Sequence, residues 1–214
     1  RGLHCGILGF YCRNIAAVDE VPQSYVLDQI RGRHFRMIGI TLPGFDMIAS
    51  SHQLALAIKA EFPEIKCTVG GFFTTFYPNE ILENNPAFDY LVVGDGEEPL
   101  CQLLTTPEAE ISRASIAGLA YRDPLTKRVI YTPAGQQMDL NTLPMPTTRF
   151  SHQMVNIFGR NVAIAGLCTS KGCRNHCSFC SVAETSNLLS PHQRRRSLSA
   201  AKTLERIASL VKAG

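Results

Sequence analysis

Short apolar segments alternate with helix-like segments along the first half of this 214-residue chain. The apolar segments have the length of strands and cover residues 3–10, 36–42, 65–70 and 88–93. Between them, residues 50–62 place Leu54, Ile58 and Phe62 at every fourth position, as on one face of a helix. Strands that are apolar throughout and joined by helices predict an α/β fold, with a parallel sheet covered by helices on both faces.

Small and polar residues follow the expected strands at their carboxyl ends. The second apolar segment ends with Thr41 and is closed by Pro43-Gly44, Gly70 and Gly71 end the third, and Gly94-Asp95-Gly96-Glu97 follows the fourth. In open parallel sheets ligands bind beyond this edge, and glycine lets the backbone approach them closely. The same glycines also suit ordinary tight turns, so the pattern predicts either a ligand site or a set of turns.

The pattern changes after the fourth apolar segment. Residues 116–122 and 128–133 flank Asp-Pro-Leu-Thr-Lys and predict a β-hairpin. Residues 139–150 hold two prolines and favour an extended linker. The predicted organisation is therefore a first domain over residues 1–110, a hairpin and linker over 111–150, and a second unit over 151–214.

The second unit is expected to contain one strand, one loop and one helix. Residues 161–167 predict a strand that leads into a cysteine-rich loop. Residues 199–213 place Leu204, Ile207 and Val211 on one face and predict an amphipathic helix.

Three cysteines, Cys173, Cys177 and Cys180, form a C-x3-C-x2-C group. Thiolates are soft ligands that favour iron–sulfur clusters and zinc. Three protein ligands on a four-iron cubane leave one iron open, as catalytic zinc sites keep an open position. The alternatives are a zinc site, with His176 or Cys168 as fourth ligand, and buried thiols without a metal.

Eight cysteines are too unevenly spaced for the disulfide framework of a small secreted domain, so a reducing, cytoplasmic setting is expected. The cysteines outside the group occur mostly in apolar contexts, where a free thiol behaves as a small hydrophobic residue. We expect these to be core residues: Cys5, Cys12, Cys67, Cys101 and Cys168.

The cysteine spacing, with Phe179 before the last cysteine and a strand before the loop, resembles the signature of the radical S-adenosylmethionine superfamily. The resemblance implies that Cys173, Cys177 and Cys180 each ligate one iron of a 4Fe–4S cluster. S-adenosylmethionine would bind the fourth iron, with Phe179 near its adenine, although Phe179 could also be a plain core aromatic. The implied chemistry is a 5′-deoxyadenosyl radical that abstracts hydrogen from a substrate, with an electron donor such as flavodoxin or ferredoxin.

Four segments of the first half, MIGITLPG, VGGFFTTFYPNEIL, FDYLVVGDGEEPL and IAGLAYR, together resemble the cobalamin-binding domain that precedes many radical S-adenosylmethionine barrels. The implied fold is a Rossmann-like parallel sheet followed by the first βα unit of a partial (β/α) barrel. The chain would thus be a piece of such an enzyme. The resemblance implies that cobalamin is lined by Thr41, Gly70, Gly71, Gly94, Gly96 and Glu97.

One cobalamin-binding group supplies a cobalt ligand from a D-x-H-x-x-G motif, which His4, His34 and His52 do not match. We therefore expect no histidine from the protein on cobalt. The implied activity is that of a methyltransferase acting on an unactivated carbon of a small-molecule or peptide substrate. A radical cyclase or oxidoreductase with the same cofactors, or a non-catalytic corrinoid- or metal-binding module, are the alternatives.

The charge of the chain excludes some partners. Its net charge is +3, and much of the basic excess lies in the run Arg194-Arg195-Arg196, which we interpret as the solvated start of a helix. No apolar stretch approaches the roughly 20 residues that cross a bilayer. We expect neither a membrane nor a nucleic-acid partner.

Overall fold

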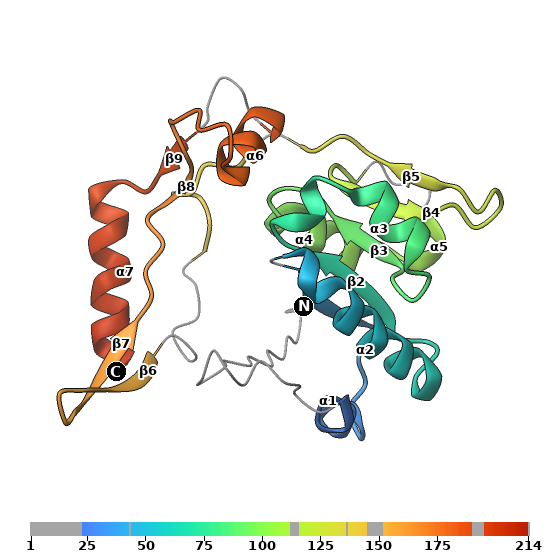
Figure 1. The fold of residues 1–214 in the computed structure, drawn as a ribbon, viewed down its shortest axis with the longest axis horizontal. Coiled ribbons are helices and arrows are strands. Elements are labelled where there is room, and N and C mark those ends of the chain that lie inside the picture. The colour runs from blue at the N-terminus through green and yellow to red at the C-terminus, as the bar shows by residue number, and fades with distance from the viewer. Residues whose placement is uncertain are drawn as a thin grey trace. The chain divides into compact units, whose positions relative to one another are not determined.

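The computed structural model describes residues 23–42, 44–111, 116–135, 137–144, 152–189 and 195–213. These residues fall into two compact units that divide after residue 136, and each is described by itself (Figure 1). The strand expected over residues 3–10 lies outside the described residues. Within the described ranges, no helix is both long and apolar enough to span a membrane.

A five-stranded sheet forms the centre of the first unit, in the order β1-β2-β3-β4-β5. The strands are β1 Met37–Thr41, β2 Lys66–Gly70, β3 Tyr90–Val92, β4 Leu119–Arg122 and β5 Val129–Tyr131. The first three are parallel, as the apolar segments predict, whereas β4 and β5 run antiparallel. The predicted hairpin therefore forms and extends the same sheet, which makes the sheet mixed.

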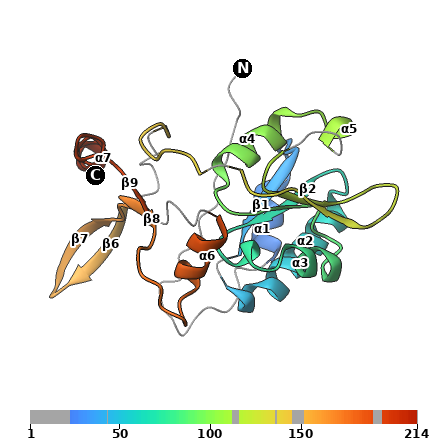
Figure 2. The same cartoon turned by 90° about the horizontal axis from the view of Figure 1, so that it is seen from above.

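Helices cover both faces of this sheet (Figure 2). On one face lie α1 Gln23–Ile30, α2 Ile48–Glu61 and α3 Pro78–Asn84, and on the other α4 Glu97–Thr105 and α5 Glu108–Ile111. Two 3₁₀ turns, η2 Phe45–Met47 and η3 Phe73–Thr75, follow β1 and β2. The α/β fold class predicted from the sequence is therefore confirmed.

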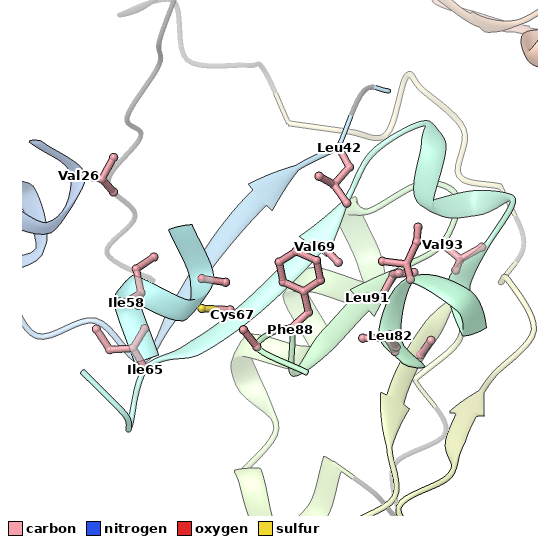
Figure 3. Packing of buried hydrophobic residues seen from close by; sticks show 14 of the residues in the cluster. Val26, Leu42, Ile58, Ile65, Cys67, Val69, Leu82, Phe88, Leu91 and Val93 are labelled. Carbon is pink, nitrogen blue, oxygen red and sulfur yellow. The ribbon is translucent and has the colours of Figure 1, made fainter. Parts of the chain in front are cut away.

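Alternation along β3 explains why both faces carry a core. Successive side chains of a strand point to opposite faces. Leu91 packs with Phe88 and Val69 in the larger cluster, which Figure 3 shows, while Tyr90 and Val92 belong to the second cluster. A strand buried on both faces reads as a near-continuous apolar run, as residues 88–93 do apart from Asp89.

Arg122, the last residue of β4, holds the hairpin to the helix that covers the sheet. Its guanidinium donates to the carbonyl oxygens of Phe88 at 2.7 Å and Asn85 at 2.8 Å, and also to that of Leu82. These carbonyls lie at and just beyond the end of α3, where a helix leaves acceptors without intrahelical donors. Burial lowers the pKa of Arg122 below its ordinary value.

The second unit contains two small antiparallel sheets and two helices. Its elements are β6 His152–Ile157, β7 Arg160–Ala165, β8 Ser170–Gly172, α6 Ser181–Leu189, β9 Arg195–Ser197 and α7 Ala200–Ala213. Strand β6 pairs with β7, and β8 pairs with β9. Helix α7 is the predicted amphipathic helix, and Ser199 caps it by accepting the Lys202 amide at 3.2 Å.

Two expectations about the strands of this unit need correction. The strand expected over residues 161–167 forms as β7, but β8 leads into the cysteines. Residues 160–165 instead close a hairpin across Phe158 and Gly159, whose φ angles of 49° and 80° suit a two-residue turn. In the basic run, Arg195 begins strand β9 rather than a helix, and Arg194 is not described.

The interpretations of the basic run as solvated and of the linker as extended also need correction. Arg196 is buried and not solvated. Its Nη1 donates to the Met138 carbonyl oxygen at 2.7 Å. The described part of the linker turns rather than extends. Its Asp139 carboxylate accepts the Asn141 amide at 3.0 Å, and Leu140 is buried.

Candidate functional site

The carboxyl ends of β1 and β2 meet at one edge of the sheet. Thr41 and Gly70 are partners in the parallel register. Just beyond them the Leu42 amide donates to the Gly70 carbonyl oxygen at 2.7 Å, and the Phe73 amide donates to the Leu42 carbonyl oxygen at 3.3 Å. The structure therefore brings together Thr41 and Gly70, two of the residues predicted to line a ligand.

Gly71 fills a position that excludes a side chain. Its φ is +116°, and an added Cβ would lie 2.9 Å from Thr41 Oγ1 and 3.0 Å from the Leu42 carbonyl oxygen. Gly70, in contrast, would make ordinary contact at 3.6 Å from Val92 Cβ. The tight-turn interpretation thus holds for Gly71, whose backbone packs directly against the turn after β1.

The end of β3 is tied to the turn after β2 by two hydroxyl groups. Thr75 Oγ1 accepts the Gly94 amide at 3.1 Å. Thr74 Oγ1 lies 2.8 Å from the Gly71 carbonyl oxygen and 3.0 Å from that of Val92. Sequence reasoning missed both threonines, although hydroxyl residues soon after a glycine pair at a strand end often bond the nearby backbone.

The remaining predicted residues of this edge begin α4. Gly96 is its N-cap, and the Gly96 carbonyl oxygen accepts the Leu100 amide at 3.0 Å. Glu97 is the exposed first helical residue, where a carboxylate interacts favourably with the positive end of the helix dipole. A Cβ on Gly96 would lie 3.7 Å from Val92 Cγ1, so this turn also packs against β3.

Aromatic rings lie beside the same strand ends, and sequence reasoning did not single them out. The Phe45 ring, after β1, is 6.2 Å from that of Phe73, which is 5.4 Å from the Tyr77 ring. Phe45 is 74% exposed and Tyr77 49% exposed. The segments that follow β1 and β2 therefore offer exposed aromatic surface.

The cysteine loop lies between β8 and α6 and is anchored to that helix. The Cys173 amide donates to Ser186 Oγ at 3.3 Å. The Cys180 amide donates to the Cys177 carbonyl oxygen at 3.1 Å, and the Cys180 carbonyl oxygen accepts the Ala183 amide at 3.1 Å. Cys180 therefore joins the loop to the first turn of α6.

The donor chemistry of this loop fits an iron–sulfur cluster. Cys173, Cys177 and Cys180 are free thiols, and Cys173 Sγ accepts the Asn175 amide at 3.4 Å. Across the described ranges, no group of three His, Cys, Asp or Glu side chains is gathered to hold a metal ion. Because such sites often form only as the metal binds, joint ligation by the three sulfurs stays a prediction that rests on donor type and spacing.

The other residues discussed around this loop are exposed. Phe179 is 90% exposed, so its interpretation as a core aromatic is wrong, and its place near adenine stays a prediction. His176 and Cys168 are exposed as well, and Cys168 Sγ lies 3.2 Å from the Ser170 carbonyl oxygen.

The cysteines outside the group do not share one environment. Cys67 is fully buried as predicted, and burial raises its pKa to about 11. Cys101, on α4, and Cys168, after β7, are exposed, so their expected core positions are wrong. Apolar neighbours in sequence do not fix which side of a helix or loop a thiol occupies. Cys5 and Cys12 lie outside the described residues.

Of the three histidines compared with the cobalt-ligand motif, His34 and His52 lie in the described part of the first unit. His52, on α2, packs edge-on against Phe88 with ring centroids 5.5 Å apart, and burial lowers its pKa. His34 is exposed, and His4 is outside the described ranges. The absence of a protein histidine on cobalt stays a prediction.

Comparison with protein families and curated proteins identifies relatives of this chain. The B12 binding domain family matches residues 1–104. Two curated relatives are anaerobic magnesium-protoporphyrin IX monomethyl ester cyclases. The one from Synechocystis sp. is 26% identical over 129 residues, which are 60% of this chain and 25% of that protein. The one from Cereibacter sphaeroides is 26% identical over 172 residues, 78% of this chain and 27% of that protein. The chain spans about a quarter of the length of each.

Solved structures show the same fold. The cobalamin-dependent S-adenosylmethionine radical enzyme OxsB, with aqua-cobalamin and S-adenosylmethionine bound, has a TM-score of 0.68 at 18% identity. The match covers 90% of this chain and 25% of that one. The apo form of OxsB has a TM-score of 0.64 at 20% identity. Residues 1–104 thus match the B12 binding domain family, and the chain shares its fold with part of a cobalamin-dependent S-adenosylmethionine radical enzyme.

Proposed function

We propose that this chain binds cobalamin at the carboxyl edge of its sheet and a 4Fe–4S cluster at Cys173, Cys177 and Cys180, as part of a radical S-adenosylmethionine enzyme. One observation carries the proposal: three free thiols in a C-x3-C-x2-C loop lie between a strand and a helix, in a chain whose first half matches a B12 binding domain. The edge residues Thr41, Gly70, Gly71, Gly94, Gly96 and Glu97 are the proposed cobalamin contacts.

The chain's own residues would place these groups. Gly71 lets the backbone after β2 pack directly against the turn after β1, and the bond from the Gly94 amide to Thr75 holds the end of β3 in place. In the loop, the Asn175 amide bonds Cys173 Sγ, and such bonds to sulfur help to set the reduction potential of a cluster. When bound, the cluster with S-adenosylmethionine supplies one-electron radical chemistry. A reduced flavodoxin or ferredoxin would donate the electron.

For the reaction itself we keep two proposals. Methyl transfer to an unactivated carbon follows from the resemblance of the sequence. A radical cyclisation is favoured by a separate observation, since the curated relatives are cyclases of a porphyrin ester. Either reaction would act on a small-molecule or peptide substrate.

Cofactor content tests the proposal. After anaerobic reconstitution we expect about four irons and four sulfides per chain. The variant with Cys173, Cys177 and Cys180 all changed to Ala should lose them. Cys101→Ala, which removes an exposed thiol of the first unit, is the matched control and should keep them. One zinc per chain and no bound hydroxocobalamin would support a non-catalytic metal-binding module instead.

Reductive cleavage separates the enzyme from a binding module. With dithionite, a longer protein that contains this chain and completes the barrel should convert S-adenosylmethionine into 5′-deoxyadenosine, and its triple cysteine variant should not. Absence of that product from the longer protein loaded with four irons would contradict the enzyme assignment.

A further inference from the structure

One three-residue turn connects the ends of all three parallel strands. In η3, the Phe73 amide bonds the Leu42 carbonyl oxygen beyond β1. Thr74 Oγ1 reaches the carbonyl oxygens of Gly71 and Val92, beyond β2 and at the end of β3. Thr75 Oγ1 completes the set by accepting the Gly94 amide at 3.1 Å.

The bond from Gly94 to Thr75 differs from the others because of where Gly94 lies. The preceding residue, Val93, is fixed by its amide to the Gly118 carbonyl oxygen at 2.8 Å. Gly94 itself has a φ of +79° and no side chain, so its backbone has wide conformational freedom. The Thr75 hydroxyl is therefore the acceptor that fixes the backbone where it leaves β3 for α4.

Loss of this acceptor would act locally. Thr75 is 9% exposed and its bond to Gly94 is part-buried, so a methyl in place of the hydroxyl would leave the Gly94 amide without this acceptor. Without this hydrogen bond the observed conformation of the turn is less favoured, so other backbone conformations become populated. The affected turn carries Gly94 and Gly96, which are proposed cobalamin contacts.

We propose that Thr75 is a positioning residue for cobalamin, which acts through Gly94 and does not itself need to touch the ligand. The inference rests on the proposed function, since it assumes cobalamin at this edge. It assigns to the Thr75 hydroxyl the task of holding the turn from Gly94 to Gly96 in the shape that receives the ligand.

Three variants of the 214-residue chain test this role by equilibrium dialysis with hydroxocobalamin. Thr75→Val keeps the shape and removes the hydroxyl, and it should weaken binding by about tenfold. Thr75→Ser keeps the hydroxyl and should bind as the wild type does. The matched control is Thr68→Val, because the Thr68 hydroxyl also joins β2 to β3, at 3.4 Å from the Tyr90 carbonyl oxygen, but inside the sheet.

Amide exchange of the unliganded proteins gives a readout that does not depend on cobalamin. The segment around Gly94 should exchange faster in Thr75→Val than in wild type, Thr75→Ser or Thr68→Val. Should Thr75→Val not fold, as judged by its circular dichroism, Thr75→Ala takes its place in the same comparison.

The outcomes separate the inference from the proposed function. If the wild type binds no hydroxocobalamin, the proposed function fails and this inference fails with it. If the wild type binds but Thr75→Val binds equally well, or Thr75→Ser binds as poorly as Thr75→Val, only the positioning role of the hydroxyl is overturned.

Discussion

Cys67 and Cys101 are free thiols of the same unit, yet burial separates their chemistry. Cys67, on β2, lies in the same core cluster as Ala55 and Ile58 of α2, and burial raises its pKa to about 11 (Figure 3). Since the thiolate is the reactive form, a buried thiol with a raised pKa is inert at neutral pH. Cys101 and the three loop cysteines are at least partly exposed.

Thiol labelling tests this difference. Iodoacetamide at about pH 8, near the ordinary thiol pKa, should modify Cys101, Cys173, Cys177 and Cys180 in the folded apo chain but leave Cys67 unmodified. In denaturant Cys67 should react as well. Peptide mass spectrometry identifies each site, and alkylation of Cys67 as fast as of Cys101 in the folded chain would contradict its core position.

His52 gives the first unit a pH-dependent stability. Burial and the charge of Arg122 lower its folded-state pKa, so the unfolded chain binds this proton more readily. The free energy of unfolding should therefore fall as pH decreases through about 6.5, the ordinary histidine pKa. Denaturant unfolding between about pH 5.5 and 7.5 measures this slope. His52→Gln should flatten it, and His34→Gln, at an exposed position, should leave it unchanged.

At the scale of elements, turns decide how closely the strand ends approach. Gly71 and Gly32 both have positive φ, at +116° and +72°, but only Gly71 has neighbours within reach of an added Cβ. Substitution at Gly32 therefore tests backbone strain alone, and substitution at Gly71 tests strain together with steric overlap.

Gly71→Ala should lower the free energy of unfolding more than Gly32→Ala. Backbone strain at a positive φ costs roughly 1–2 kcal/mol in each variant. The contacts of 2.9 Å and 3.0 Å to Thr41 and Leu42 add a further cost at Gly71 only. Chemical denaturation of both variants gives the comparison, and equal losses would mean that the turn after β1 moves aside easily.

The elements that could be predicted from the sequence are those whose apolar residues form a recognisable local pattern. Residues 36–42, 65–70 and 88–93 contain β1, β2 and β3. Strand β3 is buried at every position and β2 at its three central positions, and buried strands of parallel sheets are mostly apolar. The β6–β7 pairing and the burial of Arg196 depend on partners distant in sequence or on a turn with two positive φ angles. Periodicity carries no signal for either.

The candidate site follows the same rule. Glycines and threonine at strand ends indicate the edge, since the carboxyl ends of parallel strands share it. The hydroxyls of Thr74 and Thr75 became meaningful only with the structure, because their acceptor and donor lie on β3 and beyond it, 18 and 19 residues away. For Cys101, which occurs among apolar residues, local sequence predicted burial where α4 leaves it exposed.

At the scale of the whole molecule, ligand binding should stabilise the part that holds the ligand. A ligand that binds the folded state alone, at a hundredfold excess over its Kd, raises the free energy of unfolding by about 2.7 kcal/mol. Hydroxocobalamin should therefore raise the thermal midpoint of the first unit and slow amide exchange at the ends of β1, β2 and β3. Protection confined to other segments would place cobalamin elsewhere.

The antiparallel hairpin also protects the polypeptide against association. By bonding to β3, strand β4 covers a row of backbone donors and acceptors that would otherwise recruit strands from other molecules. Arg122 belongs to that strand, so a protein cut off near residue 110 would also leave the carbonyl oxygens of Leu82, Asn85 and Phe88 without this donor. A preparation of the first unit alone should carry the chain through residue 136, so that it keeps both strands of the hairpin and the bonds of Thr132 to Leu119, or expect precipitation.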